Sequence, residues 1–286
     1  MPIQIAYCWT HQTDQTGART LVEAMREAAL KLPFAKVGEI LTDSWGDEQT
    51  RNPNRRRRRT FETEADLERH FARWPGRWFV KNEDDDDADG QLIEPTWTCY
   101  FTAALNGCDP VTAGLSQHVS QIKVRREWGG YSEASTGLEG LMAWQCRIET
   151  LNASLPQHGG WDNFFRQHTT VLRFLEAIEK LGVTLEVWDQ GGYWETASKD
   201  LLSKELERSS AITARSLGEA KDQMQHGEIL RNIMPFLTHP QFEQLEAKGE
   251  QMANEDSPNR HWMRQAEEHT REEPWQEHHR HLSEEE

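Results

Sequence analysis

The segment over 161–195 constrains the fold of this chain more than any other segment. Its apolar residues recur with the i, i+3, i+4, i+7 spacing of a helix that buries one face. We expect Asp162 or Asn163 to cap the start of this helix and Gly182 to end it in the left-handed conformation. A strand and then a turn are predicted over 183–192. The apolar positions are Phe164, Phe165, Val171, Leu172, Leu175, Ile178 and Leu181.

The N-terminal part of the chain predicts a β-α-β unit. Alternating residues over 3–9 indicate a strand, and Thr13 or Asp14 is expected to cap the helix that follows. A second strand is predicted over 37–42.

The middle of the chain predicts antiparallel strands. Turn residues over 106–110 separate two predicted strands, 96–105 and 111–124, which we expect to form a hairpin. The alternation over 142–149 indicates a half-buried strand, with a helix as the alternative. These elements predict an α+β fold, in which an antiparallel or mixed sheet carries helices on one face. A ferredoxin-like split β-α-β arrangement is the specific hypothesis, followed by a helical C-terminal extension.

The charge distribution predicts two regions. Residues 1–224 are expected to form the α+β domain, with charged loops at 51–60 and 83–90. Residues 225–286 are expected to form a polar helical extension and an acidic, partly disordered tail. Half of the net charge of −16 lies over 241–286, because this stretch holds 13 acidic and 5 basic residues.

Composition restricts the classes of function. A net charge of −16 argues against general binding to nucleic acid or to anionic membranes, and it suits a basic protein partner. The sequence shows no apolar run of membrane-spanning length, we expect no secretory signal, and the four cysteines predict reduced thiols. We therefore expect a cytoplasmic protein that contacts no membrane, and we expect no cofactor and no metal. Motifs of nucleotide-binding, zinc-protease and serine-hydrolase sites are absent from the sequence.

The turn motif over 189–195 is the strongest functional candidate. One interpretation makes Asp189, Glu195 and His168 an acid/base or metal-assisted catalytic cluster, with Tyr193 and Trp194 as a wall that stacks on a substrate. The other makes the motif structural, with a carboxylate that bonds turn amides and aromatic residues that pack. The predicted binding residues are Gly191, Gly192, Tyr193 and Trp194.

The same region resembles an uncharacterised bacterial family. The resemblance is carried by Phe164 and His168 on a helix, and by Asp189, Gly191, Gly192, Tyr193, Trp194, Glu195 and Thr196 after a strand. It covers about a third of the chain, from residue 144 into the 220s. The preceding strand departs from the family pattern at 147–151. The resemblance supports the helix–strand–turn–helix prediction and implies no activity.

Three hypotheses of function follow. The first is a non-catalytic protein-binding module, in its sharper form an acidic binder or inhibitor of a basic partner. The second is a hydrolase that uses Asp189, Glu195 and His168. The third is nucleic-acid binding through the basic loop, whose run of five arginines is followed by four aspartates. The arginines are Arg55, Arg56, Arg57, Arg58 and Arg59.

Overall fold

The computed structural model describes residues 3–44, 76–80, 91–125, 131–223, 234–237 and 239–255. The predicted arginine loop at 51–60, the acidic loop at 83–90 and the tail after residue 255 lie outside these ranges. The chain divides into two compact units, Pro2–Leu206 and Glu207–Glu286. The boundary between these units falls within a helix, and the boundary predicted at 224/225 lies outside the described ranges and stays a prediction.

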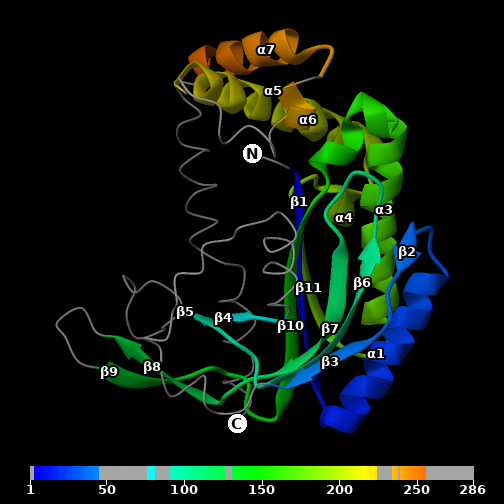
Figure 1. The fold of residues 1–286 in the computed structure, drawn as a ribbon, viewed down its shortest axis with the longest axis vertical. Coiled ribbons are helices and arrows are strands. Elements are labelled where there is room, and N and C mark those ends of the chain that lie inside the picture. Colours follow the sequence, from blue (N-terminus) through cyan, green and yellow to red (C-terminus); the bar gives the residue numbers. More distant parts are fainter. Residues whose placement is uncertain are drawn as a thin grey trace. The chain divides into compact units, whose positions relative to one another are not determined.

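The elements follow the chain in this order (Figure 1). They are β1 (Gln4–Gln12), α1 (Gln15–Leu30), β2 (Lys36–Val37), β3 (Leu41–Ser44), β4 (Trp78–Val80), β5 (Gln91–Ile93), β6 (Trp97–Ala104), β7 (Val111–Gln117), β8 (Gln121–Arg125), β9 (Tyr131–Ser135), β10 (Leu141–Glu149), η2 (Leu151–Ser154), η3 (Pro156–His158), α3 (Gly160–Glu179), β11 (Thr184–Asp189), α4 (Tyr193–Thr196), α5 (Lys199–Gln223), α6 (Met234–Leu237) and α7 (Phe242–Glu255).

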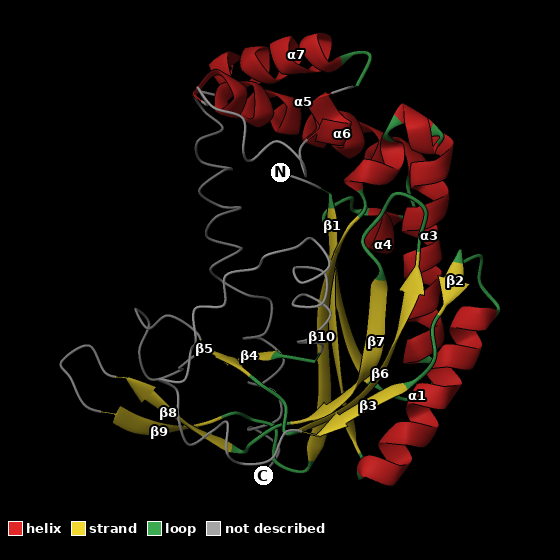
Figure 2. Ribbon diagram, in the orientation of Figure 1, coloured by secondary structure: helices red, strands yellow, loops and turns green. Residues whose placement is uncertain are grey.

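The main sheet is antiparallel and confirms the α+β class (Figure 2). Its order is β11-β1-β10-β7-β6-β2, and β3 also pairs with β6. The strands β10 and β11 flank β1 and are joined by α3, which makes a split β-α-β unit. A four-stranded ferredoxin-like sheet would place the strand after α1 next to β10. Here β7 and β6 lie between them, so the sheet is wider than the predicted arrangement.

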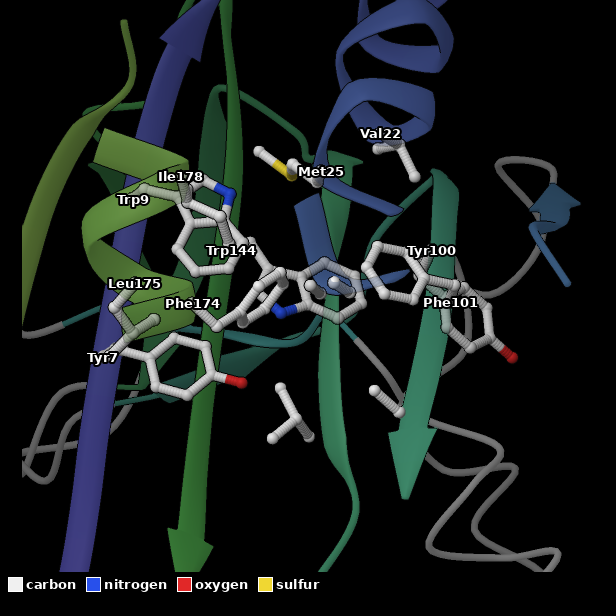
Figure 3. Close-up of a cluster of buried hydrophobic side chains, with 14 of the residues drawn as sticks. Tyr7, Trp9, Val22, Met25, Tyr100, Phe101, Trp144, Phe174, Leu175 and Ile178 are labelled. Atoms are coloured by element: carbon white, nitrogen blue, oxygen red, sulfur yellow. The ribbon is translucent and has the colours of Figure 1, made fainter. Parts of the chain in front are cut away.

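The helices α1 and α3 pack on one face of this sheet and share its core (Figure 3). The buried residues of α1 are spaced by four, three and four positions, as the periodicity requires. Asp14 caps this helix as predicted, because its Oδ1 accepts a hydrogen bond from the Gly17 amide at 2.8 Å. The core combines Ala18, Val22, Met25 and Ala29 of α1 with Val171, Leu172, Phe174, Leu175 and Ile178 of α3.

The start of α3 differs from the prediction. Its N-cap is Gly159, with φ at +106°, and neither Asp162 nor Asn163 caps it. Asn163 lies inside the helix, where its Nδ2 donates to the carbonyls of Asn106 and Ala153 at 3.0 Å each. The Asn163 side chain therefore fixes the predicted β6–β7 turn against α3 instead of capping the helix.

Two predicted strands are interrupted. The strand predicted over 37–42 is divided into β2 and β3, and at the break the Gly38 carbonyl accepts a hydrogen bond from Arg26 Nε of α1 at 2.7 Å. The strand predicted over 111–124 is divided into β7 and β8. His118 lies between them and bonds through Nε2 to the Gly76 carbonyl at 2.8 Å. The β6–β7 hairpin and the strand over 142–149 are confirmed.

Aromatic side chains replace part of the ladder between β10 and β7. These strands pair only at Met142–Gln117 and Ala143–Ser116. Beyond these pairs, the β7 carbonyls accept side-chain hydrogen bonds. The Thr112 carbonyl accepts from Tyr7 Oη at 2.7 Å and from Trp144 Nε1 at 3.0 Å. Trp9 Nε1 donates to the Gly114 carbonyl at 3.0 Å. Buried backbone acceptors therefore remain satisfied where the strands separate.

The C-terminal unit contains most of α5 together with α6 and α7. The helix α7 lies close to α5, where a Cβ at Gly249 would meet the Ala211 carbonyl at 2.3 Å. Lys248 and Glu207 add an exposed ion pair at 3.0 Å. Across the described parts of both units, every helix is too short or too polar to cross a membrane.

Candidate functional site

The predicted turn motif is built around the carboxylate of Asp189. This residue ends β11 and lies opposite Ile5 of β1, on the face of the sheet that the helices cover. Its Oδ1 accepts from the Gly191 amide at 2.8 Å. Its Oδ2 accepts from the amides of Tyr193 at 2.8 Å and Trp194 at 3.0 Å. The carboxylate therefore satisfies amides that open α4, as a helix cap does.

His168 supplies the fourth contact of this carboxylate. Its Nε2 lies 3.2 Å from Asp189, and both side chains are fully buried. Because a carboxylate only accepts, Nε2 carries the proton and donates. The other ring nitrogen, Nδ1, lies 3.2 Å from Thr150 Oγ1. The Thr150 hydroxyl also lies 3.4 Å from the Ile3 carbonyl, so these contacts bring α3 and β11 together with the residues that precede β1 and follow β10.

The electrostatics of the turn favour an ionised Asp189. Burial alone would raise the pKa of this carboxyl, because it disfavours the charged form. The hydrogen bond and charge of His168, and the amides of Trp194 and Gly191, outweigh burial and hold the pKa below its ordinary value. The charged carboxylate is therefore a stable part of the turn.

The two glycine positions of the motif require glycine for different physical reasons. Gly192 has φ at +64°, a conformation that residues with a Cβ rarely adopt. Gly191 needs space, since a Cβ there would lie 2.4 Å from Leu202 Cδ1 and 3.1 Å from Asp189 Oδ1. Together they let the start of α5 close over the turn.

The structure brings together two of the three predicted catalytic residues. His168 and Asp189 are in contact, whereas Glu195 is exposed on α4. Thr150, His168 and Asp189 follow the hydroxyl–imidazole–carboxylate order of a catalytic triad. However, Thr150 and His168 have no exposed surface, and Asp189 already carries four contacts. This arrangement holds the turn and leaves no space for a substrate beside the hydroxyl.

The predicted binding residues Tyr193 and Trp194 lie at a half-buried aromatic surface. We define the aromatic surface as Trp161, Phe165, Tyr193 and Trp194. The rings of Trp161 and Phe165 stack at 5.7 Å, and Phe165 meets Tyr193 edge-on at 5.6 Å. Lys199 Nζ lies 4.3 Å above the centre of the Phe165 ring, within cation–π range.

Sequence reasoning missed several members of this site. Thr150 and Lys199 carry no motif signal, because each joins the site only through tertiary contact. Trp161 and Phe165 are four positions apart on a helix, so their shared face could have been predicted. Over the described ranges, no group of three or more His, Cys, Asp and Glu side chains is placed to hold a metal ion. The predicted phosphate-binding arginines Arg55–Arg59 lie outside those ranges.

In comparisons with known proteins, no family model, curated protein or solved structure matches the chain.

Proposed function

We propose that this chain is a non-catalytic protein-binding module that uses the aromatic surface of α3 and α4. The supporting observation is that the Asp189 carboxylate accepts hydrogen bonds from the amides of Gly191, Tyr193 and Trp194, which hold the turn and the start of α4. The motif therefore serves to place Tyr193 and Trp194 beside the rings of α3. Tryptophan and tyrosine dominate the binding energy of many protein interfaces, because they bury large area with few rotatable bonds.

The partner we propose is basic. Three exposed carboxylates neighbour members of the aromatic surface or Lys199 in the sequence, Asp162, Glu195 and Asp200, alongside the exposed cations Arg166 and Lys199. An aromatic surface on an acidic protein suits a partner that presents Lys or Arg around an apolar patch. The net charge of −16 adds long-range attraction, which raises the rate of association at low salt. A cytoplasmic location remains part of this proposal.

The hydrolase alternative has less support from the geometry. A general base must reach the proton that it removes, directly or through one water. His168 is fully buried and its two nitrogens face Asp189 and Thr150. Glu195 lies apart in solvent. The nucleic-acid alternative stays a prediction about Arg55–Arg59.

The proposal can be tested by affinity capture with matched variants. Tagged full-length chain and its Tyr193→Ala and Trp161→Ala variants are used to capture proteins from a cell lysate at low salt. A protein retained by the wild type is then purified and titrated against each variant. We expect the affinity to fall at least about tenfold for each variant, as for hot-spot residues. The matched control is Trp188→Ala, a tryptophan that is 37% exposed on β11.

The outcomes separate the two parts of the proposal. Equal binding by the wild type and both surface variants would contradict a role for the aromatic surface. Affinity that stays constant as salt is raised would contradict a basic partner, because exposed charge pairs are screened by salt.

A further inference from the structure

The turn that joins β6 to β7 contains the dipeptide Asn106-Gly107 and lies beside the start of α3 (Figure 1). Asparagine is chemically labile, because the backbone nitrogen of the next residue can attack its side-chain amide carbon. The attack is easiest when that next residue is glycine, which has no Cβ to crowd the ring that forms. Asn106 is the only asparagine of the sequence that glycine follows.

The structure requires glycine at position 107. Gly107 has φ at +75°, and a Cβ there would lie 2.7 Å from Cγ of His158 and 3.1 Å from Cα of Ala153. Any other residue would meet both backbone strain and crowding. The fold therefore keeps the glycine, and the reactivity of the dipeptide is kept with it.

The two reacting groups lie in an exposed turn. Asn106 is exposed, and its side chain makes one long contact, in which Nδ2 lies 3.4 Å from Asn163 Oδ1. Gly107 is half-buried, and none of the described residues accepts a hydrogen bond from its amide. The nitrogen that must attack is therefore not held by an acceptor in the described part of the chain.

Two backbone contacts restrain the turn against α3. The Asn106 carbonyl accepts from Asn163 Nδ2 at 3.0 Å, and the Asn106 amide lies 3.4 Å from Gln167 Oε1. The carbonyl belongs to the same peptide group as the attacking Gly107 nitrogen. Because the bond from Asn163 limits rotation of this group, the reaction should be slower than in a free peptide.

We propose that Asn106 is a site of spontaneous deamidation, which weakens the attachment of the β6–β7 turn to α3. The Gly107 nitrogen loses its proton and bonds to Cγ of Asn106, and the Cγ–Nδ2 bond breaks with release of ammonia. Water then opens the succinimide ring. Attack of water at Cγ gives aspartate, and attack at the backbone carbonyl carbon gives isoaspartate, whose main chain runs through the former side chain.

Both products change the contact with α3. Asn163 Oδ1 accepts from Arg166 Nη2 and Gln167 Nε2 at 2.9 Å each, and Asn106 Nδ2 is its third neighbour. A carboxylate at position 106 has no donor, so two acceptors would face each other there. Isoaspartate also adds one carbon to the main chain and displaces the carbonyl that Asn163 bonds. This modification does not depend on the protein-binding function proposed above.

The test is timed incubation of the full chain in mildly alkaline buffer, followed by digestion and mass spectrometry of the peptides. Asn152 is the internal control, because it is also exposed and is followed by alanine. Asn106 should convert at least about tenfold faster than Asn152, a ratio that needs a barrier difference of only about 1.4 kcal/mol. Asn106→Gln should abolish conversion at this position, since glutamine would have to form a larger ring.

A synthetic peptide of residues 103–110 shows that the conditions are reactive. The folded chain should convert more slowly than this peptide, and Asn163→Ala should bring the chain closer to the rate of the peptide. No conversion at Asn106 after the peptide has converted completely would overturn the proposal. Equal rates at Asn106 and Asn152 would overturn it as well.

Asn106→Asp tests the structural consequence, because it is one of the two products. Its midpoint of urea unfolding should be lower than that of the wild type. Asn152→Asp makes the same chemical change at an exposed residue whose side chain bonds no described residue, and it should unfold like the wild type. Equal midpoints for Asn106→Asp and Asn152→Asp would overturn the weakened attachment to α3.

Discussion

The imidazole of His168 and the carboxylate of Asp189 lie 3.2 Å apart, and neither side chain is exposed to solvent. This pair joins α3 to the end of β11, while the same carboxylate bonds the amides that begin α4. Breaking this buried contact leaves a buried carboxylate without one of its partners and is strongly destabilising. The pair therefore connects α3 to the turn that carries Tyr193 and Trp194.

Replacing Asp189 with Asn should destabilise the fold by about 3 kcal/mol, because an amide group offers an N–H where three backbone amides need acceptors. Urea unfolding measures this loss. Glu195→Gln makes the same chemical change at an exposed position of the motif and should change the free energy of unfolding by less than about 0.5 kcal/mol. Equal effects of the two variants would show that Asp189 has no structural role.

Much of this fold could be predicted from periodicity. The spacing of apolar residues identified α1 and α3, and alternation identified β1 and β10. The order of the strands could not be predicted, because β6 and β7 enter the sheet through pairings between distant residues. The contact of Arg26 with Gly38 at the break between β2 and β3 is visible only in the folded chain.

The sequence predicted which residues form the motif of the site, but it could not predict their contacts. The sequence of the turn indicated Asp189 and the two glycines, and it left open whether the carboxylate serves catalysis or structure. That choice depends on burial and on four hydrogen-bond partners, one of which is His168 on another element.

His118 should make stability depend on pH between about 6.5 and 4. Its pKa is 6.5 ordinarily and about 4 in the fold, so the unfolded chain binds the proton first as pH falls. Stability is complete above pH 6.5 and should fall by about 2 kcal/mol between pH 7 and pH 5 through this residue. Asp189 does not contribute in this window, since its lowered pKa confines its loss to pH values below 3.8.

His118→Gln is the variant that checks this pH dependence, because its amide can still donate to Gly76. Urea titrations at pH 7 and pH 5 give the change in stability for both proteins. The variant should lose about 2 kcal/mol less than the wild type over this interval. The same pH dependence in both proteins would contradict a buried, neutral His118.

Cys108 should react slowly with alkylating reagents although it is partly exposed. Burial, and then the nearby Asp109, raise the pKa of this thiol from 9.0 to about 12. The thiolate fraction falls about 1000-fold, and the greater nucleophilicity of a more basic thiolate recovers only part of the rate. The net rate should be roughly fiftyfold below that of a short peptide with the same sequence. Timed labelling with iodoacetamide and mass spectrometry measures both rates, and a peptide-like rate in the folded chain would contradict the prediction.

Gly114 should not tolerate alanine. A Cβ at this position would lie 2.3 Å from the Cys99 carbonyl oxygen and 2.8 Å from Trp144 Cζ3. Both neighbours are fixed, because Cys99 lies in the paired strand β6 and the indole of Trp144 bonds to the Thr112 carbonyl. Gly114→Ala should therefore destabilise the fold by about 3 kcal/mol, at the upper end of overpacking effects. It should also change the near-UV circular dichroism of the tryptophans.

Gly140→Ala is the control that separates crowding from backbone strain. Gly140 has φ at +70°, and a methyl group added there would meet no described atom within 4 Å. Gly140→Ala therefore introduces backbone strain without crowding. It should lose about 1 kcal/mol and keep the tryptophan signal. If Gly114→Ala lowered the free energy of unfolding no more than Gly140→Ala, this would contradict the close packing of Gly114 against β6 and Trp144. A larger loss confined to Gly114→Ala would locate the tightest packing of the sheet where β10 and β7 separate.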